Sequence, residues 1–189
     1  MNKTITTPAG IARYPRLNSP DTKFSEEGQY KVDLEMSAED AEPFLKQVEA
    51  MFSEFVADKK RELKKDTLKI HAAPWSENDG LVQLKLKVKA TGKSKDGETY
   101  TRQPKLFDAS GQITNENIGG GSKLKVAVVP YFWYTASLGA GITLQPKAVQ
   151  ILDLVTWSSG GTAEAYGFEV TEAPRASVKT GTNNEEVEW

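Results

Sequence analysis

The stretch "LVQLKLKVKA" at residues 81–90 alternates apolar and polar side chains without interruption. Val82, Leu84, Leu86 and Val88 share one parity, and Gln83, Lys85, Lys87 and Lys89 share the other. A period of two is typical of a β-strand with one buried face. The strand therefore presents three ammonium groups in a row on its solvent side, spaced about 7 Å apart.

Other parts of the chain show the same strand pattern. Alternation or β-rich composition marks residues 28–36 ("GQYKVDLEM"), 98–108, 123–138, 141–155 and, less clearly, 7–17 ("TPAGIARYPRL"). The Asp-Gly pair at 96–97 predicts a hairpin between 81–90 and 98–108, and "GAG" at 139–141 joins the last two long strands. The glycine-rich stretch at 115–123 is interpreted as a mobile loop inside one domain, because strands lie on both sides of it.

One long helix is predicted after residue 36. Ser37 can cap its start and Pro43 suits a first turn. The residues at helical spacing that form its apolar stripe are Phe44, Leu45, Val48, Met51, Phe52, Phe55 and Val56. Five or six strands with one helix indicate a mainly β (α+β) fold, and specifically an OB-fold, which is a five-stranded, partly open Greek-key barrel. We expect this domain over residues 1–172 and a flexible acidic C-terminal tail over 173–189.

Composition places the chain among ordinary globular proteins, with 38% hydrophobic and 26% charged residues. Its 189 residues include no cysteine, which argues against disulfides, a thiol nucleophile or a zinc finger. We find neither a signal-peptide pattern nor an apolar run long enough to span a membrane. The expected location is the cytoplasm, which for a phage-encoded protein is that of the host cell.

The net charge of −2 conceals an uneven distribution of charge. Residues 81–134 contain nine basic and four acidic residues, whereas 181–189 contain three acidic residues and no basic one. For binding, this asymmetry between a basic middle and an acidic end matters more than the net charge.

Catalytic patterns are scarce in this sequence. His71 is the only histidine, "TGKSKDG" at 91–97 lacks the first glycine of a phosphate-binding P-loop, and there is no G-x-S-x-G elbow. We therefore predict no catalytic residues, no metal site and no cofactor, and we expect that the protein is not an enzyme.

The strand that begins at Lys123 indicates the ligand. If alternation continues through Pro130, Lys123, Lys125, Tyr131 and Trp133 share the face opposite the core. Cations bind phosphates and exposed rings stack on unpaired bases, the combination that single-stranded nucleic acid requires. The lysine row at 85–89 fits the same role, although lysines also protect edge strands from aggregation.

The complete candidate set combines these basic and aromatic side chains with others on the predicted strands and loops. It consists of Arg13, Tyr14, Arg16, Trp75, Lys85, Lys87, Lys89, Tyr100, Arg102, Lys105, Lys123, Lys125, Tyr131 and Trp133. Trp75 is placed in a proline-containing loop. Because rings are common in the cores of small barrels, we expect about a third of the set to be buried.

The order of several motifs resembles one family. These are "TPAGIARYPRL", "GQYKVDLEM" before a long helix, "LFDASGQ", "GGGSKLKVAVVPYFWY", "GITLQPKAVQIL" and an acidic end with a terminal aromatic residue. Together they resemble the OB-fold single-stranded DNA-binding proteins of tailed bacteriophages, over roughly residues 4–170 and the tail. The resemblance implies a protein that coats single-stranded DNA during replication and recombination, without sequence preference and without a cofactor.

The resemblance also implies a role for the tail. Glu185, Glu186, Glu188 and Trp189 would occupy the DNA groove in the free protein and contact replication proteins such as polymerase and primase-helicase. The tail is short, with three acidic residues and Trp where the family usually has Phe. Whether it acts in cis, in trans or in both ways stays open, as do a homodimer and the choice between DNA and RNA.

Two other classes of protein remain as alternatives. A β-barrel structural or assembly protein of a phage would explain the strands but not the basic and aromatic face. A metal-dependent DNA-processing enzyme would explain that face but not the missing catalytic constellation.

Overall fold

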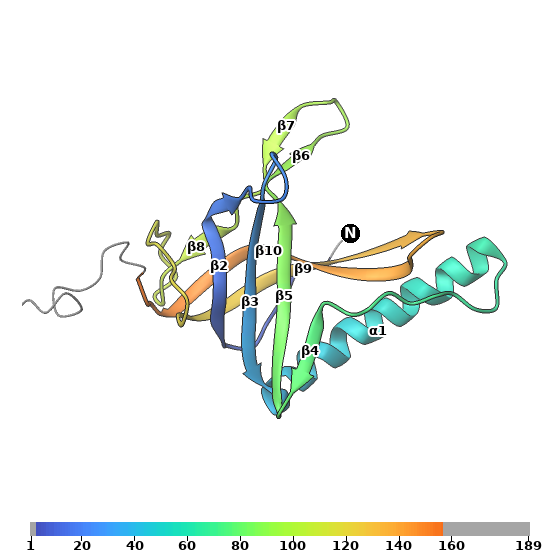
Figure 1. Ribbon diagram of the computed structural model, residues 1–189, viewed down its shortest axis with the longest axis horizontal. Helices are drawn as coiled ribbons and strands as arrows, with labels where there is room; N and C mark the ends of the chain where they lie inside the picture. The colour runs from blue at the N-terminus through green and yellow to red at the C-terminus, as the bar shows by residue number, and fades with distance from the viewer. Residues whose placement is uncertain (1–2, 157–189) are drawn as a thin grey trace, which may run out of the picture. The chain divides into compact units, whose positions relative to one another are not determined.

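One helix and ten strands make up residues 3–156, the part of the chain that the computed structural model describes (Figure 1). The helix is α1 (Ala38–Leu63). The strands are β1 (Ile5–Thr6), β2 (Gly10–Asp21), β3 (Gln29–Ser37), β4 (Trp75–Asn78), β5 (Leu81–Lys89), β6 (Thr91–Lys93), β7 (Thr99–Thr101), β8 (Lys105–Phe107), β9 (Lys123–Thr135) and β10 (Gly139–Asp153).

Five of these strands close into a barrel in the order β9, β2, β3, β5, β10 and back to β9. All neighbours are antiparallel except β5 and β10, which run parallel. The β5–β10 seam has one Cα pair and the β2–β9 seam has two, so the barrel is only partly closed there. The predicted OB-fold is confirmed, and β1, β4 and β8 extend its sheet.

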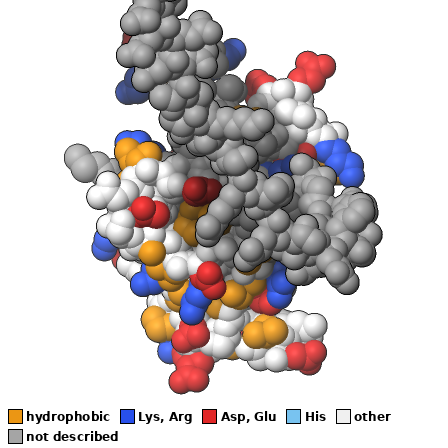
Figure 2. All heavy atoms as spheres, turned by 90° about the vertical axis from the view of Figure 1, so that its left-hand side faces the viewer, with side chains coloured by type: hydrophobic (Ala, Val, Ile, Leu, Met, Phe, Trp, Pro, Cys, Tyr) orange, Lys and Arg blue, Asp and Glu red, His pale blue; other side chains and the backbone are white. Residues whose placement is uncertain are grey.

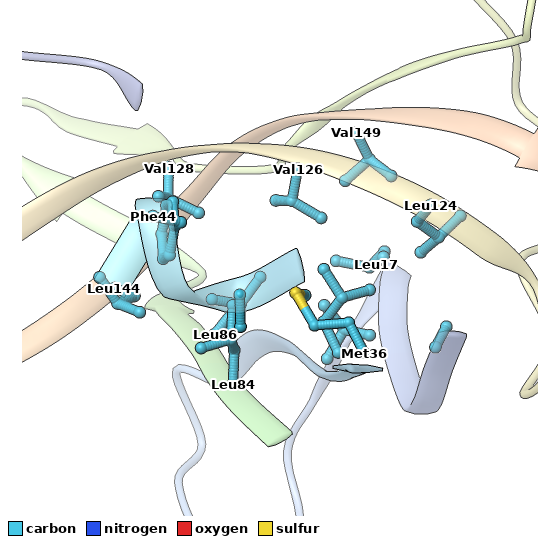
Figure 3. Packing of buried hydrophobic residues seen from close by; sticks show 14 of the residues in the cluster. Leu17, Met36, Phe44, Leu84, Leu86, Leu124, Val126, Val128, Leu144 and Val149 are labelled. Carbon is cyan, nitrogen blue, oxygen red and sulfur yellow. The ribbon is translucent and has the colours of Figure 1, made fainter. Parts of the chain in front are cut away.

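The alternation in the sequence determines which side chains fill the barrel. β3 and β5 pair over nine residues, with Val32 opposite Leu86 and Leu34 opposite Leu84, and all four are fully buried. Leucines and valines of β9 and β10 meet them from the other side (Figure 3). Removing one such side chain from water contributes about 1.5–3 kcal/mol to folding. The polar residues between them consequently lie outside the barrel.

The helix begins as predicted, with the Ser37 hydroxyl accepting a hydrogen bond of 3.1 Å from the Asp40 backbone N–H. Phe44 and Val48 of its first half are buried in the barrel core. Its second half extends beside the β9–β10 hairpin, where Phe52 and Phe55 lie 5.6 and 5.7 Å from the Phe132 ring (Figure 1). Pro43 lies in the second turn, one turn later than predicted.

The predicted hairpin between 81–90 and 98–108 is wrong in its partners. The Asp-Gly turn at 96–97 instead joins β6 to β7 in a separate two-stranded sheet, while β5 pairs with β3 and β4. β8 runs parallel to β10. The chain changes partners at Ala90. The Ala90 N–H donates to the Gly28 carbonyl, and the Ala90 carbonyl accepts from the Arg102 N–H. Beyond this residue, β6 leaves the barrel.

The prediction of five or six strands was too low, because the additional strands have only two to four residues. Runs this short have no readable period. Trp75 also lies in one of them, at the start of β4, rather than in a loop.

The glycine-rich stretch at 115–123 is a loop of the barrel domain, as predicted. Ile118 is buried in the core. The Gly119 N–H donates to the Val155 carbonyl at 2.7 Å, and the Gly121 N–H donates to Ala12 at 2.8 Å. The predicted boundary at residue 172 and the predicted tail lie outside the described residues. Within residues 3–156, no helix is long and apolar enough to cross a membrane.

Candidate nucleic-acid interface

The outward side chains of β3, β5, β10 and β9 form one basic and aromatic surface. Cross-strand register places Lys31 of β3 opposite Lys87 of β5, and Thr143 of β10 opposite Tyr131 of β9. All four residues lie at the alternate strand positions whose side chains point away from the core. The same alternation that builds the barrel therefore gathers cations and rings from distant parts of the chain.

Three adjoining hollows run along this surface. The first is lined by Lys87, Lys89, Lys93, Arg102 and Tyr131, among others. The second is lined by Lys31, Asp33, His71, Lys85, Lys87 and Trp133, and the third by Arg13, Tyr14, Arg16, Lys23 and Lys31 with the loop around Gly120. Lys87 lines the first two hollows and Lys31 the last two, so each hollow adjoins the next. We call the three adjoining hollows together the groove.

One face of the molecule carries side chains of mixed type. Figure 2 shows the side that lies on the left of Figure 1, where acidic, basic and apolar side chains of the described residues are interspersed. In the groove, the outward residues of β5 from 85 to 89 are all lysines. A local excess of positive charge can attract a polyanion to a protein whose net charge is −2.

Trp133 has a fixed position at the centre of the groove. Its indole N–H donates to the Thr143 hydroxyl at 3.2 Å, and its ring lies 5.3 Å from the His71 ring. The ring crosses the neighbouring strand above Gly141, where a Cβ atom would overlap it. The "GAG" stretch therefore has a second role besides the turn, because Gly141 provides the space in which the half-buried indole lies.

Arg102 is positioned at one end of the groove by the small β6–β7 sheet. Its guanidinium lies 5.5 Å from the Tyr100 ring centre and donates to the Tyr100 hydroxyl at 3.3 Å. A Cβ at Gly92 would overlap both side chains. The missing side chain at Gly92 lets this cation lie flat against the hairpin.

Carboxylates lie beside several of the cations. Arg13 bonds to Glu35 at 2.9 Å, and Lys31 bonds to Asp21 at 2.5 Å. The hydrogen bond from Lys31 is the main cause of a lowered pKa at Asp21. Because these cations already have partners, incoming phosphates compete with internal carboxylates for them.

Asp33 is the acidic group nearest the centre of the groove. It lies opposite Lys85 in the register, and the Gln83 amide donates to it at 3.1 Å. Burial raises the pKa of Asp33, and the charges of Lys85 and Lys31 oppose that rise. Its ionised form is therefore poorly solvated, and it repels any anion placed in the groove.

We predict that Asp33→Asn tightens oligonucleotide binding about fivefold at neutral pH, which corresponds to an exposed charge interaction of about 1 kcal/mol. A nearby phosphate raises the pKa of Asp33 further, so protons and DNA favour each other's binding. Wild-type affinity should rise as the pH falls from neutral to about pH 5, near the range where carboxyls titrate. Fluorescence titrations at both pH values check this.

The His71 ring also lines this hollow. The Asp33→Asn variant isolates the contribution of Asp33, since any pH dependence left in that variant belongs to other groups. A wild-type affinity that falls on acidification would contradict the assignment.

The structure brings nine of the fourteen predicted residues together in the groove. They are Arg13, Tyr14, Arg16, Lys85, Lys87, Lys89, Arg102, Tyr131 and Trp133. Tyr100 and Lys105 line a separate hollow beside β8, which Arg102 also reaches. Lys125 lines another, between β1 and β8, and Lys123 lies at the start of β9. Trp75 packs against the core.

The expectation that about a third of the set is buried was wrong. None of the fourteen side chains is buried: Trp75, Arg102 and Trp133 are half-buried and the others are exposed. The reason is that aliphatic residues fill the barrel, while the lysine positions of β5 and β9 alternate outward.

Sequence reasoning missed several residues that line the groove. They are Lys23, Phe24, Lys31, His71, Lys93, Thr143 and the three carboxylates Asp21, Glu27 and Asp33. The parity of "GQYKVDLEM" could have identified Lys31, since Val32 and Leu34 beside it point inward. Nothing local could have identified the hydroxyl of Thr143, because the cross-strand pairing defines its role.

The model of the single-stranded DNA-binding protein family of bacteriophage T7 matches residues 9–154. This chain belongs to that family. The single-stranded DNA-binding protein of enterobacteria phage T3 is 30% identical to it over 213 residues, which cover 99% of this chain and 91% of the relative. That of Escherichia phage T7 is 34% identical over 125 residues, covering 61% of this chain and 53% of the relative.

Solved structures give the same result for the fold. The crystal structure of gp2.5, the single-stranded DNA-binding protein of bacteriophage T7, superposes with a TM-score of 0.72 at 28% identity. The match covers 94% of this chain and all of that one. The single-stranded DNA-binding protein of bacteriophage Enc34 in complex with ssDNA matches with a TM-score of 0.53 at 14% identity, covering 83% of this chain and 89% of that one. At that identity the likeness concerns the fold alone.

Within residues 3–156, no group of three or more histidine or acidic side chains is arranged to hold a metal ion. The chemical groups that line the groove are cations, aromatic rings and a few carboxylates.

Proposed function

We propose that this protein binds single-stranded DNA without sequence preference, along the groove on the outer face of its OB barrel. The observation that carries the proposal is the position of Trp133 and Tyr131 next to the lysine row of β5 in adjoining hollows. Rings offer stacking surfaces for any base, and lysines bind any phosphate. The name that the family shares supports the same ligand.

A duplex offers these rings no free base face, because its bases are stacked on each other. Single strands should therefore bind more tightly than duplexes of equal charge. The proposed role follows from this preference: the protein coats and protects single strands exposed during phage DNA replication and recombination.

Quenching of tryptophan fluorescence tests the ligand directly. We expect oligo(dT) and mixed-sequence single strands to quench with similar affinity, and the affinity to decrease steeply with salt. Absence of binding at low salt, or tighter binding of duplex than of single strands, would overturn the proposal.

We further propose that the protein acts by binding and not by catalysis. Among the described residues, the groove offers no arrangement of nucleophile and base, and Glu35 and Asp21 pair with cations. Incubation of purified protein with single- and double-stranded DNA and magnesium should leave both intact. Cleavage that persists in repeatedly purified protein would instead favour a DNA-processing enzyme.

Residues 181–189 contribute a regulatory role in this proposal. Glu185, Glu186 and Glu188 supply carboxylates in place of phosphates, and Trp189 supplies an indole in place of a base. Such a segment can compete for the groove and can recruit replication proteins such as polymerase and primase-helicase. The proposed site of action is the cytoplasm of the host cell.

Deleting 181–189 should tighten binding of oligo(dT) severalfold at low salt, because three competing negative charges are removed. The gain should disappear at high salt, where all these interactions are screened. A matched control replaces Glu185, Glu186 and Glu188 with glutamine and keeps Trp189. Unchanged or weaker binding after deletion would contradict competition for the groove.

A further inference from the structure

Tyr14 and Phe24 are exposed far more than aromatic side chains usually are. Their exposed fractions are 79% and 81%, and among the described large apolar residues only Ile113, at 76%, is comparable. Leaving a ring in water forgoes the burial that makes aromatic residues useful to a fold. Two such rings at one hollow mark a candidate ligand contact.

The backbone projects Tyr14 out of the sheet. The register between β2 and β3 changes between Arg13 and Arg16, so Tyr14 and Pro15 form a bulge. Tyr14 has a φ of 50°, in the left-handed region that side chains other than glycine rarely adopt. A bulge that redirects a side chain, together with a strained φ, marks functional positions in many proteins.

Phe24 approaches the same hollow from the turn between β2 and β3. Its ring lines the hollow with Tyr14, and the Lys23 ammonium lies 5.5 Å from the ring centre. Arg16 and Lys31 also line it, and Asp21 is the one acidic residue among the lining residues. The hollow thus offers two exposed rings among an excess of positive charge.

The floor of this hollow is held in place by hydrogen bonds. The Asn18 side chain donates to the Glu116 carbonyl at 2.8 Å and accepts from the Ile118 N–H at 3.0 Å. The loop that carries Gly119 and Gly120 is therefore fixed to β2. Gly120 leaves the floor open, because nothing lies closer than 4.0 Å to where its Cβ would be.

We propose that Tyr14 and Phe24 form a second base-stacking subsite for single-stranded DNA, separate from the subsite of Trp133 and Tyr131. The phosphates of this segment bind Arg16 and Lys23. Lys31 lines both this hollow and the next one along the groove, so a single strand can continue from one subsite to the other. The inference rests on the proposed function. It adds that one molecule binds a strand long enough to span both subsites.

A strand that is long enough reaches both subsites, whereas a short one occupies one of them. A second set of contacts then strengthens binding only beyond a threshold length, because the two subsites act through one ligand. The subsite therefore predicts how affinity depends on length, which a single stacking site does not.

The test measures the anisotropy of labelled oligo(dT) of increasing length with Phe24→Ala and Tyr14→Ala variants of the full chain. Long oligonucleotides should bind each variant about 5- to 150-fold more weakly than wild type, the equivalent of one lost stacking contact. Oligonucleotides too short to reach both subsites should lose less affinity than long ones, because they can still bind at the subsite of Trp133 and Tyr131. Phe24→Tyr should restore binding, since it restores a ring.

Ile113→Ala is the matched control, because Ile113 is equally exposed but lines none of the three hollows. Normal affinity of Phe24→Ala and Tyr14→Ala for every length would overturn the second subsite while the proposed function stands. A loss of equal size at every length would overturn it too, since all contacts would then belong to one subsite. Failure of wild type to bind any oligonucleotide would overturn both.

Discussion

Replacing Trp133 with alanine should weaken binding of short oligo(dT) about 5- to 150-fold, the range for loss of one stacked base. The indole is already oriented by its hydrogen bond to Thr143 and by the space above Gly141, so no ordering cost reduces its contribution. Fluorescence anisotropy with labelled oligonucleotide measures the loss. Trp133→Phe should retain most of the affinity, because a ring remains.

Gly141→Ala provides a second way to disturb the same ring. The added methyl group would overlap the indole and displace it, so this variant should bind nearly as weakly as Trp133→Ala. In the Trp133→Ala background the methyl group has nothing to displace, and Gly141→Ala should have little further effect. Additive losses in the double variant would show that Gly141 acts through something other than the indole.

Replacing Lys85, Lys87 and Lys89 together with glutamine should weaken binding about 100-fold at about 0.1 M salt. Each phosphate contact to a single strand contributes about 0.7 to the slope of log affinity against log salt, so three contacts contribute about 2. The slope should become shallower by that amount, and the two proteins should converge towards high salt. A salt series for both proteins measures both effects.

Glutamine at Lys105, Lys123 and Lys125 is the control for the triple variant. It removes the same charge from residues that lie outside the three hollows of the groove. The control should lose affinity only through long-range attraction, by far less than the groove variant. Equal losses would mean that net charge, and not the groove, determines binding.

Much of the barrel could be predicted from local alternation. The parity of β5 assigned Val82 to the core and Lys85 to the solvent because a period of two allows no other arrangement. The Ser37 cap was equally local, since a hydroxyl before an apolar stripe satisfies the N–H groups of a first turn. These features depend on neighbouring residues alone.

Features that depend on tertiary pairing could not be predicted. The change of partners at Ala90 depends on Gly28, which is distant in sequence, so 98–108 was assigned the wrong neighbour. Trp75 is of a residue type that can stack on bases, but its pairing with Leu84 turns it towards the core. Phe24 lies in a turn without periodicity, and only the fold shows that it shares a hollow with Tyr14.

Photocrosslinking tests the central claim most directly, namely that single-stranded DNA lies along the groove. Oligo(dT) that contains 5-iodouracil is irradiated in complex with the full chain, and mass spectrometry identifies the crosslinked residues. The account predicts crosslinks at Trp133 and Tyr131, with long oligonucleotides adding Tyr14 and Phe24. Crosslinks confined to Trp75 or to the hollow around Tyr100 and Lys105, with none at Trp133 or Tyr131, would contradict it.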